Sequence, residues 1–457
     1  MSARSMKPHE ESASGDSESR DPRPGRSPKP RRNLVLAALA LGSLVLASAS
    51  AEAQYNLPGS SQPSGDIPPK EDFEERIEEA RWRFGGLRIQ PWLGIRDAAW
   101  VTLENNETGV EEDDFTLTVG AGLRGYLPVA GKSYWTFQAL PEYVWWSDLE
   151  DRRRTNGRYG IGYFGYFNNL RVELSHRIDE SQGFFSNEIR QLISLSDQTS
   201  RLALELDLGS RFQLVGRFTL QELENQIEEE SLFSRLDRDE DRGLVEVRYK
   251  AARGWTVGLG FEDRSTDFVG SGRNLDNSAD GGRLFVSAEG NRVQGLLQVS
   301  VLSFEPDAGS AFPEVDETVG ELAVVWNLSS QIDMLTYSRR GLSYALDPAS
   351  AYYLGDRTGV RLVFGSRQVR VGLVAEFGQD DYEPLFAGPA RSDDVTELGI
   401  SLDFPVGRFL AVGFDLNQTE YDSNIATFDR DVLDFGFRVE LGRLLERLRL
   451  GSDDNAW

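Results

Sequence analysis

The chain has 457 residues, and its 74 acidic residues outnumber its 49 basic ones, for a formal net charge of −25. It contains no cysteine, which excludes disulfides and thiolate metal sites. A mean hydropathy of −0.41 with 27% charged residues leaves no room for a bundle of membrane helices. The negative charge also argues against nucleic acid as a partner, because the phosphate backbone would repel it.

The first expected element is a secretory signal peptide. Two arginines at 31–32 precede an apolar stretch over 34–47, and Ala-Glu-Ala at 51–53 provides an A-x-A cleavage site. The alternative, a membrane anchor helix, requires an apolar run of about twenty residues. We therefore expect residues 1–53 to be a leader with a cleaved signal peptide. Its removal takes away 8 basic and 6 acidic residues, leaving 41 basic against 68 acidic.

Residues 54–85 are expected to be a periplasmic linker followed by a short helix. The segment over 54–69 is rich in Pro, Gly, Ser and Gln and has no hydrophobic periodicity. The stretch KEDFEERIEEARWRF then has helical spacing at Phe73, Ile77, Ala80, Arg81 and Phe84. A charged linker with transient helicity is the open alternative. Roughly thirty residues are too few for a globular plug domain, which argues against an actively gated nutrient receptor.

From residue 86 onward the hydrophobic period is two, the period of a β-strand. Alternating segments come in pairs joined by very short turns, such as SRLALELDL with RFQLVGRFTLQE, and polar loops separate the pairs. The pairs recur about every 40 residues, a pitch also typical of β-propellers. A propeller blade would place four short strands in that length, whereas each repeat here holds two strands of roughly 9 to 12 residues.

This pattern predicts an all-β fold, a transmembrane antiparallel β-barrel over residues 86–441 with about 18 strands, short periplasmic turns and longer extracellular loops. Strands of this length can cross a bilayer when tilted. An even strand number keeps both ends of the barrel on the same side. The strand-like stretch 187–196 would break the alternation of turns and loops, so we assign it to a loop. The loops expected outside lie near 105–112, 179–199, 223–242 and 267–281.

The segment VRVGLVAEFGQDDY, residues 369–382, shows how the two faces of such a strand differ. Its alternate residues Val371, Leu373 and Phe377 are apolar, while Arg370 and Glu376 lie between them. A soluble β-sandwich would also alternate, but it would rarely need eighteen such strands. We therefore expect the apolar face to meet lipid. The same face on other strands is formed by Leu202, Leu204, Leu206, Leu208, Phe212, Leu214, Phe218, Leu220, Trp255, Val257, Leu259, Phe261, Phe435, Phe437, Val439 and Leu441.

Charged residues of the opposite parity are the candidate lumen-lining set. They are Arg217, Arg248, Glu262, Arg361, Arg370, Glu376 and Arg438. Seven ionised groups cannot be buried in a dry core, because each would lose hydration without an assured partner. The set therefore predicts a wet interior.

No residue pattern indicates catalysis or a cofactor. His176 is the only histidine after the leader, and its parity places it on the apolar face, so a Ser-His hydrolase and a histidine metal site are both disfavoured. The acidic stretches at 111–114 and 237–241 lack the regular ligand spacing of a calcium loop. Paired carboxylates of glycosidase type are expected by chance on so many charged strands.

The stretch RFGGLRIQPWLGIRDAAWVTLENN, together with the hairpin array to Leu441, resembles the beta-barrel porin type 2 family. The resemblance implies an outer-membrane barrel, and several members of that family accompany exopolysaccharide or capsule export systems. One feature departs from such barrels, which usually end at an aromatic residue on the last strand. Here the C-terminal extension GRLLERLRLGSDDNAW, residues 442–457, follows that strand.

The expected function is a channel in the outer membrane of a Gram-negative bacterium that passes polar solutes or an exported polysaccharide. Eighteen strands leave an aqueous lumen, and mixed charges on its wall suit polar cargo without strong ion selectivity. The alternative is a structural or adhesive barrel acting through its extracellular loops. Expected partners are outer-membrane lipid and lipopolysaccharide, with a polysaccharide and an envelope export complex as further candidates.

Overall fold

The computed structural model describes residues 66–104, 111–183, 193–226, 237–269, 274–366, 368–386, 390–406, 410–425 and 428–441. The expected leader and signal peptide (1–53), the linker up to residue 65 and the C-terminal extension (442–457) therefore lie outside the described residues.

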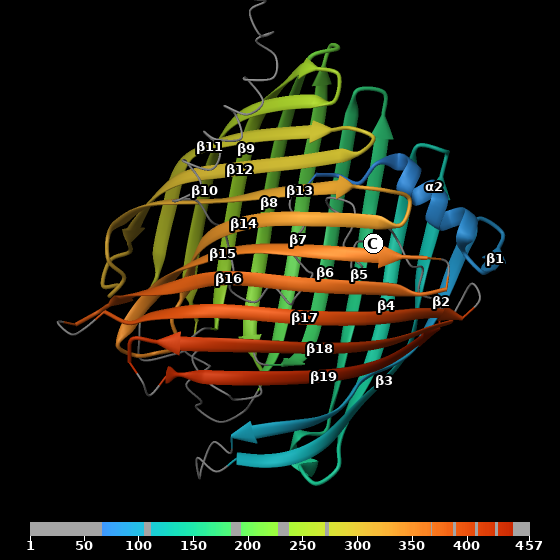
Figure 1. Ribbon diagram of the computed structural model, residues 1–457. Coiled ribbons are helices and arrows are strands. Elements are labelled where there is room, and N and C mark those ends of the chain that lie inside the picture. Colours follow the sequence, from blue (N-terminus) through green and yellow to red (C-terminus); the bar gives the residue numbers. More distant parts are fainter. Residues whose placement is uncertain are drawn as a thin grey trace, which may run out of the picture. The chain divides into compact units, whose positions relative to one another are not determined.

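Eighteen strands, β2 to β19, form one closed antiparallel barrel (Figure 1). Each strand pairs with the next along the chain, and the last strand pairs back with β2. The closing contact is short, and it joins Val439 to Ile95, Glu440 to Gly94 and Leu441 to Leu93. The predicted fold class and strand number are confirmed, and the barrel begins and ends on the same side.

The described elements outside the wall are the helix α2 (Lys70–Glu79), the short strand β1 (Trp82–Phe84) and the 3₁₀ turn η2 (Glu150–Arg152). The wall strands in chain order are β2 (Leu87–Glu104), β3 (Glu111–Val129), β4 (Ser133–Trp146), β5 (Arg154–Phe167), β6 (Leu170–Gly183), β7 (Ile193–Leu208), β8 (Phe212–Asn225), β9 (Arg238–Ala252), β10 (Trp255–Phe268), β11 (Asn277–Glu289), β12 (Val293–Pro306), β13 (Val315–Asn327), β14 (Ile332–Tyr344), β15 (Ser350–Gly365), β16 (Arg370–Pro384), β17 (Ser392–Val406), β18 (Leu410–Ser423) and β19 (Arg430–Leu441).

The wall strands are longer than the sequence predicts, because they continue past the apolar part of each segment. The predicted loop over 179–199 is wrong in part, since β6 runs to Gly183 and β7 begins at Ile193. The predicted loops over 223–242 and 267–281 are shortened in the same way. Polar side chains on these extensions resemble a loop in the sequence, yet the backbone ladder continues there because both partners of each hairpin remain extended.

Short turns and longer connections alternate around the barrel, as the hairpin pattern predicts. The turn between β9 and β10 consists of Arg253 and Gly254, and Gly254 has a φ of +75°. A Cβ atom at that glycine would lie 2.1 Å from the carbonyl oxygen of Glu289 on the neighbouring hairpin. Glycine is needed at this turn because other residues rarely adopt its positive φ, and because a side chain would collide with the backbone of Glu289.

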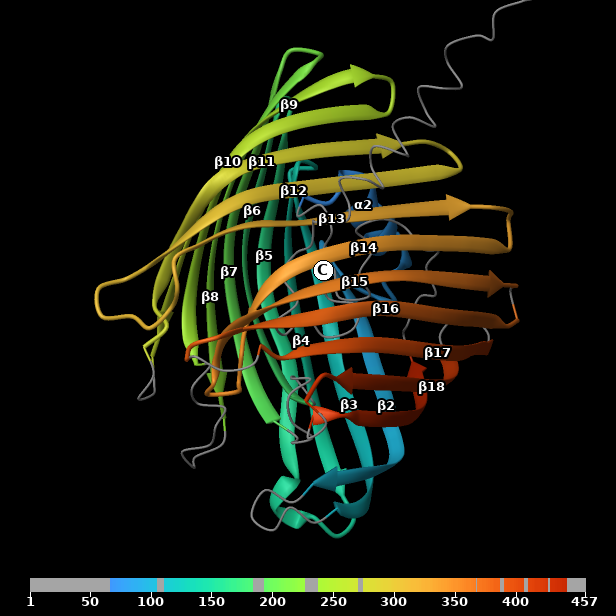
Figure 2. The same cartoon turned by 60° about the vertical axis from the view of Figure 1, so that its left-hand side comes forward.

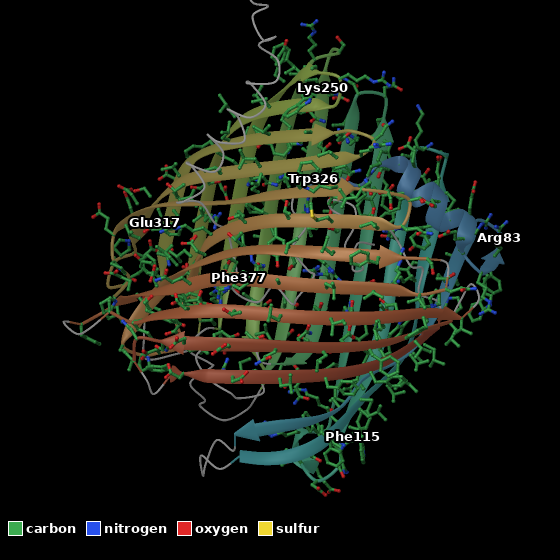
Figure 3. All side chains as sticks on the ribbon, viewed as in Figure 1. Arg83, Phe115, Lys250, Glu317, Trp326 and Phe377 are labelled. Atoms are coloured by element: carbon green, nitrogen blue, oxygen red, sulfur yellow. The ribbon has the colours of Figure 1, made fainter. Side chains whose placement is uncertain are left out.

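The two faces of the wall differ as the alternation predicts. Outward positions of β7, β8, β10 and β16 carry exposed apolar side chains, including Leu259 on β10. Phe377 on β16 is another, and Figure 3 labels it. Their neighbours along each strand point inward and are buried or half-buried, and they include the polar residues Glu205 on β7, Gln213 on β8, Glu262 on β10 and Glu376 on β16. Figure 2 shows the wall from a second direction, with β2 to β8 facing β12 to β18 across the barrel.

Candidate functional site: the charged inner wall

The seven predicted lumen-lining residues all have the parity opposite to the exposed apolar side chains of their strands. They lie on β8, β9, β10, β15, β16 and β19. The structure does not bring them into one cluster. It distributes them over three charged groups and one exposed position.

The first charged group links Arg248 and Glu262 through residues that the sequence prediction did not include. Arg248 donates to Glu246 on its own strand, and Glu246 lies 3.7 Å from Arg283 on β11. Arg283 Nη1 lies 3.5 Å from Glu262 Oε2, which also accepts a 2.8 Å hydrogen bond from Ser300 Oγ. Charges of opposite sign therefore meet across β9, β10 and β11, and Ser300 on β12 adds a neutral hydrogen-bond donor.

Arg217 lies on the same inner face, but the residue it binds does not belong to a strand of the wall. Its Nη2 donates to the carboxylate of Asp66, a residue that precedes α2. Arg248 binds the same carboxylate from the adjacent strand, with Nη1 3.0 Å from Oδ2 and Nη2 2.9 Å from Oδ1. The backbone N–H of Ile67 donates to Glu205 Oε1 at 2.9 Å, so two neighbouring residues of this segment are held by the wall.

The helix that follows packs against the same inner face near the short-turn end (Figure 1). Phe73 is only 1% exposed, because its ring lies 5.4 Å from that of Tyr134 and 4.7 Å from that of Phe164. Tyr166 completes this aromatic socket and donates a 2.6 Å hydrogen bond to the carbonyl of Pro68. We call residues 66–80 the inner segment. The predicted helix is present but ends at Glu79, and Trp82–Phe84 continue as β1.

The second charged group surrounds Glu376 on β16. Its carboxylate accepts a 2.5 Å hydrogen bond from Tyr337 and lies 3.3 Å from Arg339 and 3.6 Å from Arg357. Arg357 also donates to Asp380 at 2.7 Å. Glu376 is only 6% exposed, so it is part of a packed ionic network rather than a group that projects into open water.

The third group is formed by the last three strands. Arg438 donates to Asp415 at 2.7 Å and to Asp403 at 2.6 Å, which joins β19 to β18 and β17. Arg370 is in register with Asp403 and lies on the same inner face. Arg361 points inward like the other six residues, but it is the one of the seven whose side chain is exposed.

Several inner-wall residues were missed by the sequence prediction. Glu246, Arg283 and Arg357 have the inward parity, so applying the same rule to every strand would have found them. Asp66 has no such signal, because it lies in a segment without periodicity.

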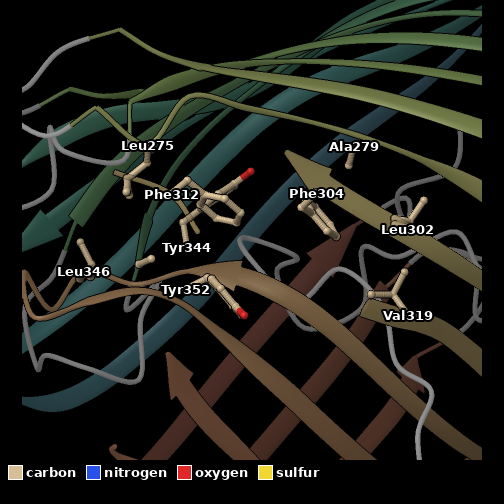
Figure 4. Packing of buried hydrophobic residues seen from close by; sticks show 10 residues of the cluster. Leu275, Ala279, Leu302, Phe304, Phe312, Val319, Tyr344, Leu346 and Tyr352 are labelled. Atoms are coloured by element: carbon tan, nitrogen blue, oxygen red, sulfur yellow. The ribbon is translucent and has the colours of Figure 1, made fainter. Parts of the chain in front are cut away.

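An apolar cluster covers part of the inner face towards the longer connections (Figure 4). Phe312, from the connection between β12 and β13, lies among the rings of Phe304, Tyr344 and Tyr352 at 5.4 to 6.2 Å. Leu275 and Leu346 come from two further connections and join the same cluster. Residues from three connections therefore pack against the inner face of the wall and fill part of the barrel interior at this end.

The remaining expectations concern histidine, metals and helices. His176 is on the outward face, in register with Ile161, and its Nδ1 lies 2.9 Å from Ser200 Oγ. In the part of the chain that the structure describes, no group of three or more His, Cys, Asp or Glu side chains is placed to hold a metal ion. Over the same residues, no helix has both the length and the apolar character needed to span a membrane.

Comparisons with known proteins add little beyond the architecture. No family model and no curated protein matches the chain, so the resemblance to the beta-barrel porin type 2 family stays a prediction. Among solved structures, the chain is similar to a BenF-like porin from Pseudomonas fluorescens Pf-5, with 10% identity, a TM-score of 0.46, and 77% and 97% of the two chains covered. It is also similar to opdK from Pseudomonas aeruginosa, with 10% identity, a TM-score of 0.46, and 77% and 98% covered.

A third similar structure is the FrpB iron transporter from Neisseria meningitidis, with 9% identity and a TM-score of 0.45. That match covers 76% of this chain, and the chain spans 63% of the length of the transporter. At such low identities and scores, these likenesses do not support a particular cargo. We therefore infer the function from the geometry of this barrel.

Proposed function

We propose that the protein is a water-filled channel in the outer membrane of a Gram-negative cell, passing polar solutes or an exported polysaccharide. The exposed apolar outer face supports a location in lipid, since an aqueous location would leave this face without apolar contacts. The periplasmic position of the short turns is part of the same proposal, as is the role of the seven candidate residues in lining the path.

The observation that carries the proposal is the exposure of Arg361. This residue points inward in a closed barrel, so the water that reaches its guanidinium is inside the wall. The groups around Glu262, Glu376 and Arg438 add charge of both signs to the inner wall, where their ion pairs replace part of the lost hydration. A closed wall with a wet, charged inside provides a path or at least a vestibule.

Planar bilayer recordings of the purified full chain test this directly. We expect stable conductance steps with modest cation preference, because the chain is acidic while its inner wall carries both signs of charge. Arg361→Glu should raise the cation preference without impairing folding, since that side chain is exposed. Arg292→Glu, in the short turn between β11 and β12, is the control for a charge change outside the strands.

Absence of conductance, together with adhesion that depends on the extracellular connections, would favour the alternative of a structural or adhesive barrel. The two cargo classes are separated by deleting the gene. Loss of surface polysaccharide while its synthesis continues would identify an export channel, whereas unchanged surface polysaccharide with open-channel conductance would identify a general diffusion porin.

The orientation is tested by labelling, which is straightforward because the native chain has no cysteine. Asp239 is exposed on the second residue of β9, at the end of the wall with longer connections, and Ser366 is exposed between β15 and β16. We expect an impermeant thiol reagent to label Asp239→Cys on whole cells and to leave Ser366→Cys unlabelled. The reverse pattern would place the short turns outside the cell.

A further inference from the structure

We propose that Arg217 and Arg248 form an oxyanion-binding site on the inner wall, and that Asp66 is its built-in competitor. The ligand class is a carboxylate or phosphate group carried by a molecule inside the barrel. This proposal goes beyond channel function, because binding at the site does not require that the barrel conduct.

The contacts of Asp66 show what the two arginines can hold. Both guanidiniums bind one carboxylate from adjacent strands, and Arg248 approaches it with two nitrogens. This forked arrangement matches the oxygen geometry of carboxylate and phosphate groups. Arg217 Nε is buried, and within the described residues it has no hydrogen-bond acceptor, so the site has a donor that Asp66 leaves unused.

Two contacts with the wall hold the Arg248 side chain in position. The guanidinium of Arg248 lies 3.7 Å from the centre of the Phe285 ring and also donates to the fully buried Glu246. Arg201 and Arg283 are further cations near Arg217. Without Asp66, therefore, Arg217 would lose this ion pair and Arg248 would keep only Glu246, which leaves a positive charge that an anion from solution could neutralise.

Asp66 differs from the wall residues because it lies in the inner segment, which is not a strand of the wall but is joined to it through the chain. Its side chain is 30% exposed, so interior water reaches the site while the carboxylate occupies it. Burial raises the pKa of Asp66, but Arg217 and Arg248 outweigh that effect and hold the pKa below its ordinary value. The carboxylate is thus ionised at neutral pH, and the contact is lost only as the pH falls below that ordinary value.

A tethered group competes at an effective concentration of roughly millimolar order, so a ligand in solution must displace it. Titration calorimetry of the folded full chain, with succinate and with inorganic phosphate, measures this competition. We expect Asp66→Ala to bind one of these anions at least about tenfold more tightly than the native chain. Glu75→Ala, which removes an exposed carboxylate from the helix α2 that follows Asp66, should bind like the native chain.

The double variant Asp66→Ala/Arg248→Gln should lose the tighter binding. Preference for succinate would identify a carboxylate site, and preference for phosphate a phosphoryl site. Equal binding by the native chain and Asp66→Ala, or full binding by the double variant, would overturn the proposal. Because binding is measured without conductance, failure of the channel proposal would be seen separately.

A second measurement retains Asp66 and reports on the inner segment. Ile67 is 2% exposed beside this carboxylate, so Ile67→Cys should react slowly with a maleimide. Succinate or phosphate should increase the labelling rate above that in sodium chloride of equal ionic strength, because displacement of Asp66 exposes its neighbour. A rate that does not depend on the anion would contradict competition at this site.

Discussion

Leu373→Arg is expected to lower the free energy of unfolding by about 2–4 kcal/mol, the cost of an arginine near the middle of a lipid-facing belt. The outward residues of β16 are apolar from Val371 to Phe377 and polar from Gln379 onward, so Leu373 lies close to the middle of that belt. It is 39% exposed and in register with Leu362 and Ile400 on the neighbouring strands. Denaturant titration of the barrel folded into phosphatidylcholine vesicles would measure the effect.

The matched control is Val374→Arg, at the next residue of the same strand. Val374 points inward opposite Arg361, so its replacement should cost no more than about 1 kcal/mol, from repulsion between the two arginines. Glu376→Gln, a change on the same inner face, would not serve as a control because Tyr337, Arg339 and Arg357 all bind that carboxylate. Equal costs at Leu373 and Val374 would mean that both faces of β16 meet water.

Glu262→Gln is expected to destabilise the barrel by about 3–5 kcal/mol, because it removes one member of a buried ionic network. Glu262 is 1% exposed and accepts hydrogen bonds from Arg264 at 2.6 and 2.9 Å and from Ser300 at 2.8 Å. Neutralising the carboxylate leaves Arg264 and Arg283 without their common counter-ion. The same vesicle-based unfolding experiment would measure the loss.

A double-mutant cycle distinguishes this ionic effect from a packing effect. Arg264→Gln combined with Glu262→Gln should restore part of the lost stability, because the guanidinium that paired with Glu262 is removed as well. Glu289→Gln, at an exposed residue that ends β11, should change stability by less than about 0.5 kcal/mol. A small effect at Glu262, comparable with that at Glu289, would show that bulk water rather than ion pairing solvates the inner wall.

The number of strands and the direction of their faces could be predicted from the sequence because both depend on local patterns. Alternation with period two decides which side of a strand is apolar, as at Leu373 and Glu376. Short turns such as Arg253–Gly254 decide where one strand ends and the next begins. The ends of the strands could not be predicted, since a polar extension such as Gln198–Thr199 resembles a loop until its partner on β8 is known.

The sequence by itself determined the eighteen-strand alternating wall and the presence of charge on its inner face. Only the tertiary structure decided which charges meet, because Arg248, Arg283 and Glu262 come together through the register of several strands. It also placed Asp66 against Arg217, at a separation of 151 residues along the chain. A contact over such a distance depends on barrel closure and on the Phe73 socket, and neither is encoded in the residues around Asp66.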